Sequence, residues 1–245
     1  MQDNIKTPDI SIVILCYRTE DFARRFTEKI VSFLEKERVD YELVLVGNYT
    51  SRSGDRTPDI VKELAEEYPK VIAVVKPKQG MMGWDMRSGL EAANGRYIAI
   101  IDGDGQMPYQ DLAKIYKMIK TGNFDLCKTY RTRRDDGIYR KLLSKIYNII
   151  FSVIFYKNPG GDINSKPKIM TKASYDKLTL TSDDWFIDAE IMIQANRLGF
   201  KIGEIPTVFE KNIRRTSFVK ISAILEFIKN IIIYRIRECF IKRQG

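Results

Sequence analysis

The chain has 245 residues, 44% of them hydrophobic and 30% charged, which is typical of one globular domain with or without an appendage. Its formal net charge of +9 favours anionic partners such as phosphate-bearing substrates, acidic lipid surfaces or nucleic acid. The sequence has no histidine and only three scattered cysteines, which excludes histidine-based catalytic triads and argues against a disulfide framework.

The first half of the chain alternates short apolar runs with amphipathic segments. Strands are expected over residues 10–15, 41–46, 71–75 and 97–101, and helices over residues 20–35, 57–68 and 84–93. Strands and helices that alternate at this spacing predict an α/β fold with a mostly parallel, doubly wound sheet.

The strand predicted over residues 97–101 ends in two aspartates that are one residue apart. Asp102 and Asp104 are each followed by glycine, so a ligand can come close to the backbone of this turn. Ligands of open α/β sheets bind at the carboxyl ends of strands, and paired carboxylates suit Mg²⁺ or Mn²⁺ carrying substrate phosphates. The alternative for this segment alone is a solvated Asp-Gly turn.

The second half of the chain is less regular. It predicts helices over residues 111–120, 139–156 and 188–198, strands over residues 124–128, 168–170 and 200–206, and a basic loop over residues 131–136. A last helix runs from residue 217 nearly to the end, so the chain divides into a domain of residues 1–215 and a C-terminal amphipathic helix of residues 216–245. This helix fits a position on an acidic membrane surface, and it equally fits core packing or a homodimer contact.

Three segments together resemble the family 2 glycosyltransferases of the GT-A fold, and among them the polyprenyl-phosphate glycosyltransferases. They are the glycine-rich residues 78–95, the Asp-Gly-Asp-Gly-Gln-x-Pro motif of residues 102–108, and residues 185–209. The chain departs from that family at residues 15–20, Leu-Cys-Tyr-Arg-Thr-Glu, where the family has Pro-x-Tyr-Asn-Glu. It also carries Gly47-Asn48 where the family has two aspartates that help to hold the donor nucleotide.

This resemblance implies a metal-assisted, inverting transfer of a sugar from a UDP- or GDP-sugar to a polyprenyl phosphate. It implies the catalytic residues Asp102, Asp104, Asp188 and Glu190, with the metal, Mg²⁺ or Mn²⁺, on Asp102 and Asp104. The donor-binding residues that it implies are Tyr17, Arg18, Glu20, Asn48, Gly80, Asp102, Asp104, Gln106, Arg131, Arg133 and Arg214. The expected location is the cytoplasmic, inner face of the membrane, with peripheral contact and no spanning helix.

Other functions stay open at this point. A family 2 enzyme acting on a glycan hydroxyl would need a base, for which Asp188 is the candidate, although Asp188 and Glu190 also fit a charge effect at a helix start. A sugar-phosphate nucleotidylyltransferase would need a basic, glycine-rich loop after the first strand, which residues 16–20 lack. A nucleic-acid or phosphate-binding module is disfavoured because the basic residues are spread along the chain beside acidic ones.

Overall fold

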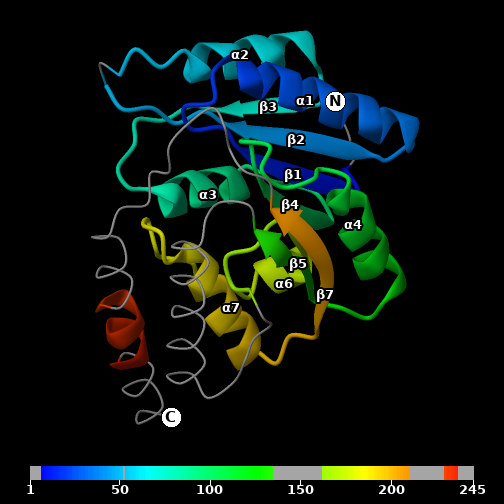
Figure 1. The fold of residues 1–245 in the computed structure, drawn as a ribbon, viewed down its shortest axis with the longest axis vertical. Coiled ribbons are helices and arrows are strands. Elements are labelled where there is room, and N and C mark those ends of the chain that lie inside the picture. The colour runs from blue at the N-terminus through cyan, green and yellow to red at the C-terminus, as the bar shows by residue number, and fades with distance from the viewer. Residues whose placement is uncertain (1–6, 52, 135–161, 210–228, 237–245) are drawn as a thin grey trace, which may run out of the picture.

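A seven-stranded sheet forms the centre of the structure, a computed structural model that describes residues 7–51, 53–134, 162–209 and 229–236 (Figure 1). The strands are β1 (Ile10–Leu15), β2 (Tyr41–Val46), β3 (Val71–Val74), β4 (Tyr97–Asp102), β5 (Leu126–Arg134), β6 (Lys168–Thr171) and β7 (Ile202–Phe209). The helices are α1 (Asp21–Lys36), α2 (Thr57–Glu67), α3 (Met82–Glu91), α4 (Asp111–Thr121), α6 (Lys172–Tyr175) and α7 (Ile187–Arg197), and residues 229–236 are also helical.

The strand order is β3-β2-β1-β4-β6-β5-β7, and the sheet is mostly parallel, as predicted. β1 pairs in parallel with both β2 and β4, β2 pairs in parallel with β3, and β5 pairs in parallel with β7. β6 runs antiparallel to its neighbours β4 and β5. Since β4 and β6 run in opposite directions, the residues just before β6 lie beside the carboxyl end of β4.

Helices cover both faces of the sheet because apolar side chains alternate along its strands. Ile12 and Ile14 pack in a cluster with α1, α2 and α4, whereas Val13 and Leu15 pack in a cluster with α3 and α7. The helical segment 229–236 belongs to the second cluster through the buried Ile231, and Figure 1 shows this segment on the same side as α3 and α7.

β5 is longer than the sequence predicts. It continues to Arg134, through residues expected to form a basic loop, because it pairs with β7 over the whole length of that strand. A shift in register between Arg131 and Arg133 accommodates the irregular stretch. The helix predicted over residues 139–156, the boundary at residues 215–216 and most of the last helix lie outside the described residues. Within the described ranges, every helix is too short or too polar to cross a membrane.

Candidate active site

The two aspartates of the Asp-Gly-Asp motif lie at the carboxyl end of β4, in the middle of the sheet. Leu15 at the end of β1 is in register with Asp102, and its carbonyl accepts a hydrogen bond of 2.9 Å from the amide of Gly103. Asp104 follows in a turn, where its Oδ1 accepts a hydrogen bond of 3.1 Å from the amide of Gln106. Both aspartates are partly exposed, so their carboxylates are accessible to a ligand.

A glycine makes this turn possible. Gly105 has a φ of +69°, and a Cβ atom there would lie 2.5 Å from the ring of Phe22. A larger residue would therefore both strain the backbone and push against α1. The turn that presents Asp104 is packed as well as hydrogen bonded.

A buried ionic cluster lies directly behind Asp102. The Nζ atom of Lys166 is 2.9 Å from Asp188 Oδ2 and 3.4 Å from Asp102 Oδ1, and Lys168 forms an ion pair with the other oxygen of Asp188. The side chains of Asp188 and Lys168 are fully buried and that of Lys166 is 2% exposed, whereas that of Asp102 is 28% exposed. The cluster therefore connects the solvent-facing carboxylate of β4 to α7 through Lys166.

The two lysines keep Asp188 in its ionised form at neutral pH. Burial opposes the ionisation of Asp188, but Lys166 and Lys168 outweigh it and lower the pKa of Asp188 to about 2. Burial lowers the pKa of Lys168 to about 8 despite its pairing with Asp188, so Lys168 still carries its proton at pH 7. Asp188 is therefore a carboxylate held by two ammonium groups, which makes it a poor proton acceptor.

The carboxylates of Asp102 and Asp104 fit a hard divalent cation. Among the residues that the structure describes, no group of three or more histidine, cysteine, aspartate or glutamate side chains could hold a metal. Two carboxylates on a partly exposed turn nevertheless match the way Mg²⁺ and Mn²⁺ bind, since these ions keep several waters and take the remaining ligands from substrate phosphates. The donor set suits an ion that arrives with a diphosphate.

A second polar cluster lies beside the ends of β1 and β2. Asn48 is fully buried, its Nδ2 donates to Asp85 Oδ1 at 3.0 Å, and its Oδ1 accepts from the amide of Lys76 at 2.8 Å. The other oxygen of Asp85 pairs with Lys78, whose Nζ lies 4.1 Å from the centre of the Tyr17 ring. Asp85 thus fixes the orientations of both Asn48 and Lys78 next to Tyr17.

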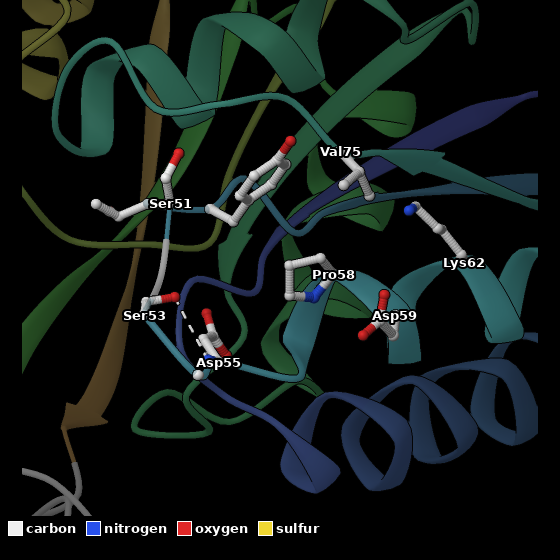
Figure 2. Close-up of a pocket in the computed structure, with 10 residues that line it drawn as sticks. Ser51, Ser53, Asp55, Pro58, Asp59, Lys62 and Val75 are labelled. Atoms are coloured by element: carbon white, nitrogen blue, oxygen red, sulfur yellow. Dashed lines mark hydrogen bonds between the residues drawn. The ribbon is translucent and has the colours of Figure 1, made fainter.

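The loops after β1 and β2 are tied together at the start of α2. The hydroxyl of Thr57 accepts hydrogen bonds from the amides of Thr19 and Glu20 at 3.0 and 2.8 Å, and it donates to Asp55 at 2.6 Å. Asp55 also accepts from the amide of Thr57, so this carboxylate organises the loop. A pocket of about 480 Å³ lies beside Asp55. It is lined also by Pro58 and by the serines of the β2–α2 loop (Figure 2).

The glycine-rich residues before α3 pack against the loop that precedes α7. A Cβ atom on Gly80 would lie 2.6 Å from the carbonyl oxygen of Asp183, and the amide of Met81 donates to that same oxygen at 2.7 Å. Both oxygens of Glu190 accept from the Thr181 amide at 3.1 Å, and one of them also accepts from Ser182 at 2.9 Å. Gly80 and Glu190 therefore shape this loop.

Arg131 lies in β5 and forms a bidentate ion pair with the carboxylate of Asp162. Its Nε and Nη2 atoms are 2.5 and 2.6 Å from the two oxygens of Asp162. The acidic residues of its own loop, Asp135 and Asp136, lie outside the described residues. The side chain of Arg133, together with Arg214 and the remaining basic residues of that region, also lies outside them.

Comparison with known protein families identifies the family of this chain. The sequence model of the family described as Glycosyl transferase family 2 matches residues 11–190. The chain belongs to glycosyl transferase family 2. This membership confirms the resemblance seen in the motifs, and it removes the reason to consider a nucleotidylyltransferase.

Curated relatives of this family 2 glycosyltransferase act on lipid phosphates according to their names. An undecaprenyl-phosphate 4-deoxy-4-formamido-L-arabinose transferase from Photorhabdus laumondii is 27% identical over 144 residues, which cover 58% of this chain and 43% of that relative. A dolichyl-phosphate beta-glucosyltransferase from Trichomonas vaginalis is 25% identical over 233 residues, which cover 89% of this chain and 70% of the relative. The chain thus spans less than half of the first relative and about two thirds of the second.

A solved structure shows the same fold. Glucosyl-3-phosphoglycerate synthase from Mycobacterium tuberculosis, in complex with Mn²⁺, uridine diphosphate and glucosyl-3-phosphoglycerate, has a TM-score of 0.71 and 16% identity. The match covers 93% of this chain and 80% of that one. The GT-A fold predicted for this family 2 glycosyltransferase is therefore confirmed.

The structure of this family 2 glycosyltransferase divides the predicted site residues into two groups, one at the end of β4 and one at the ends of β1 and β2. Asp102 ends β4, Asp104 and Gln106 lie in the turn that follows, and Asp188 is linked to Asp102 through Lys166. Tyr17, Arg18, Glu20 and Asn48 belong to the ends of β1 and β2, where the Arg18 guanidinium lies 5.4 Å from the centre of the Tyr17 ring. Sequence reasoning missed Lys166, Lys168, Lys78 and Asp85, since a lone lysine or aspartate gives no sign of burial.

Proposed function

We propose that this family 2 glycosyltransferase moves a sugar, with inversion, from a UDP- or GDP-sugar to a polyprenyl phosphate. The names of the curated relatives support this acceptor class. The turn after β4 supports a diphosphate donor, because Asp102 and Asp104 present two accessible carboxylates to the Mg²⁺ or Mn²⁺ that accompanies it. When bound, the cation would neutralise the negative charge that develops on the departing diphosphate.

The observation that carries the choice of acceptor is the state of Asp188. A hydroxyl acceptor needs a base to take its proton, whereas a phosphate acceptor is already ionised near pH 7 because its second pKa is about 6. Asp188, the base considered for a hydroxyl acceptor, is fully buried, and each of its oxygens is paired with a lysine ammonium. A phosphate acceptor requires nothing from Asp188 beyond holding Lys166 and Lys168 in place.

The remaining roles divide between donor and acceptor. Tyr17 and Lys78 form an aromatic and charged surface that suits a nucleotide. Asn48 is fully buried, so it supports this surface indirectly, through Asp85, which also pairs with Lys78. Arg18, Glu20, Gln106, Arg133 and Arg214 stay proposed contacts of the donor. Gly80 and Glu190 act on the donor side indirectly, through the loop that precedes α7.

Acceptor choice can be tested with matched lipids. With Mn²⁺ and radiolabelled UDP- and GDP-sugars, we expect transfer to a short polyprenyl phosphate and no transfer above background to the polyprenol of the same length. The rate should fall below about pH 6, where the acceptor phosphate gains its second proton. Transfer to both lipids at similar rates would reject the proposed acceptor and restore the need for a protein base.

Membrane contact is proposed for the helical segment 229–236. Ile231 is buried, Tyr234 packs against Phe186 with ring centres 5.6 Å apart, and Ile232 and Ile236 are 48% and 50% exposed on successive turns. The helix is thus attached to the domain by one face and presents isoleucines on another. These isoleucines would insert into the cytoplasmic, inner face of the membrane, where the polyprenyl phosphate lies. A homodimer contact through the same face stays the alternative.

The double substitution Ile232→Glu/Ile236→Glu is expected to lower the partition onto vesicles that contain acidic phospholipid by at least about tenfold. The two isoleucines are exposed, so the fold should be retained. Ser32→Glu/Thr121→Glu adds the same charges to α1 and α4 on the opposite face of the sheet and serves as the matched control. Equal vesicle binding by both variants in a sedimentation assay would contradict the assignment.

A further inference from the structure

Lys166 brings a positive charge to the place where the proposed metal would bind. Its Nζ is 3.4 Å from Oδ1 and 3.5 Å from Oδ2 of Asp102, so the ammonium faces both oxygens of a carboxylate assigned to the cation. Its side chain is 2% exposed, so solvent screens this interaction much less than it would at the surface.

Several contacts prevent this ammonium from moving away. The shorter ion pair, 2.9 Å to Asp188, joins it to α7, and its Nζ lies 3.5 Å from Met82 Sδ on α3. The backbone amide of Lys166 also contacts Met107 Sδ at 3.3 Å, in the segment that follows Asp104. Lys166 is therefore held between β4 and two helices.

One lysine ammonium faces Asp102, so this ammonium and the two carboxylates of Asp102 and Asp104 together carry a net charge of about −1. Lys168 compensates Asp188, which leaves the ammonium of Lys166 to offset one of the two negative charges that the turn after β4 presents. A bare divalent cation would then bring more positive charge than the site can neutralise. A cation that binds together with a nucleoside diphosphate brings the missing negative charge with it.

We infer that Lys166 is a positioning residue whose positive charge opposes that of the metal at Asp102. This charge weakens the binding of a bare divalent cation. The metal therefore binds together with the donor diphosphate. This inference rests on the proposed function, since it takes Asp102 and Asp104 as the metal ligands. In this role Lys166 controls whether the metal binds before the nucleotide or together with it. This role is separate from any contribution of Lys166 to the stability of the fold.

The comparison of Lys166→Met with Lys168→Met tests this inference. Each variant leaves Asp188 with one lysine, but only the first removes the charge that faces Asp102. Free Mn²⁺ is measured by electron paramagnetic resonance during titration of the folded protein without nucleotide. We expect Lys166→Met to bind Mn²⁺ at least about tenfold more tightly than the wild type, and Lys168→Met to bind like the wild type.

Equal Mn²⁺ affinities in the two variants, or weaker binding by Lys166→Met, would overturn the inference. Lys166→Gln repeats the test with an amide that still donates to Asp188, should the methionine variant not fold. The wild type gives a further check, because Mn²⁺ binding that is equally tight with and without uridine or guanosine diphosphate would also contradict the inference. Failure of the wild type to bind either nucleotide with Mn²⁺ would instead count against the proposed function, whatever the variants show.

Discussion

Replacing Asp104 with alanine is expected to slow sugar transfer by about a thousandfold while leaving the fold intact. Asp104 is partly exposed on a turn, where its contact through Oδ1 is with the amide of Gln106, so its loss removes little packing. Its carboxylate would provide half of the protein ligands of the cation, and the departing diphosphate would lose much of its charge stabilisation. Steady-state transfer assays at saturating Mn²⁺, together with thermal unfolding, give the two readouts.

Asp176→Ala is the matched control for Asp104→Ala. Asp176 follows α6 at the opposite end of the sheet, its side chain is 55% exposed, and it pairs with Lys172 four residues earlier. This control should transfer sugar at the wild-type rate. An Asp104→Ala protein that is folded and turns over as fast as the control would remove the metal assignment.

Replacing Asp188 with asparagine is expected to destabilise the protein by about 3 kcal/mol, which corresponds to a drop in melting temperature of about 10 °C. The carboxylate is fully buried between Lys166 and Lys168, and removal of its charge leaves Lys168 without its ion-pair partner inside the protein. Asparagine has nearly the same shape, so the loss comes from charge and hydrogen bonding more than from a cavity.

The lowered pKa of Asp188 predicts that the stability of the protein depends on pH. The pKa of Asp188 is lowered from its ordinary value of 3.8 to about 2 in the folded protein, so the ionised carboxylate stabilises the fold at neutral pH. This contribution is lost as the pH falls from about 4 to about 2. Urea unfolding across that range should show a smaller loss of stability for Asp188→Asn than for the wild type. Parallel pH profiles for the two proteins would show that the pKa of Asp188 is not lowered in the folded protein.

The sequence predicted the strands and their turns better than the pairing between them. Residues 10–15 and 41–46 were bounded correctly because each is a mainly apolar run, interrupted by Ser11 and by Glu42, between polar segments, a pattern that is typical of a buried parallel strand. The position of β6 between β4 and β5 could not be predicted, since a run of four residues that begins with a lysine carries no sign of its neighbours. The extension of β5 to Arg134 was missed because its partner β7 lies far along the chain.

The sequence predicted the partly exposed residues of the candidate site but not the buried lysines behind them. Asp102 and Asp104 were found because strand periodicity and glycines mark a turn at the end of an apolar run. The role of Asp188 could not be judged from the sequence, because its partners Lys166 and Lys168 precede it by 22 and 20 residues and look like surface charges. Only the structure shows that both oxygens of Asp188 are paired with buried lysines, and on this ground we propose Asp188 as a support for Lys166 and not as a base.

The measurement that tests the central claim most directly is a crystal structure of the protein with Mn²⁺ and a nucleoside diphosphate. The anomalous signal of manganese should appear between the carboxylates of Asp102 and Asp104, with the diphosphate oxygens completing its ligands. Manganese and diphosphate bound elsewhere, or a turn after β4 that stays without metal although the nucleotide is bound, would contradict the proposed role of this turn in sugar transfer.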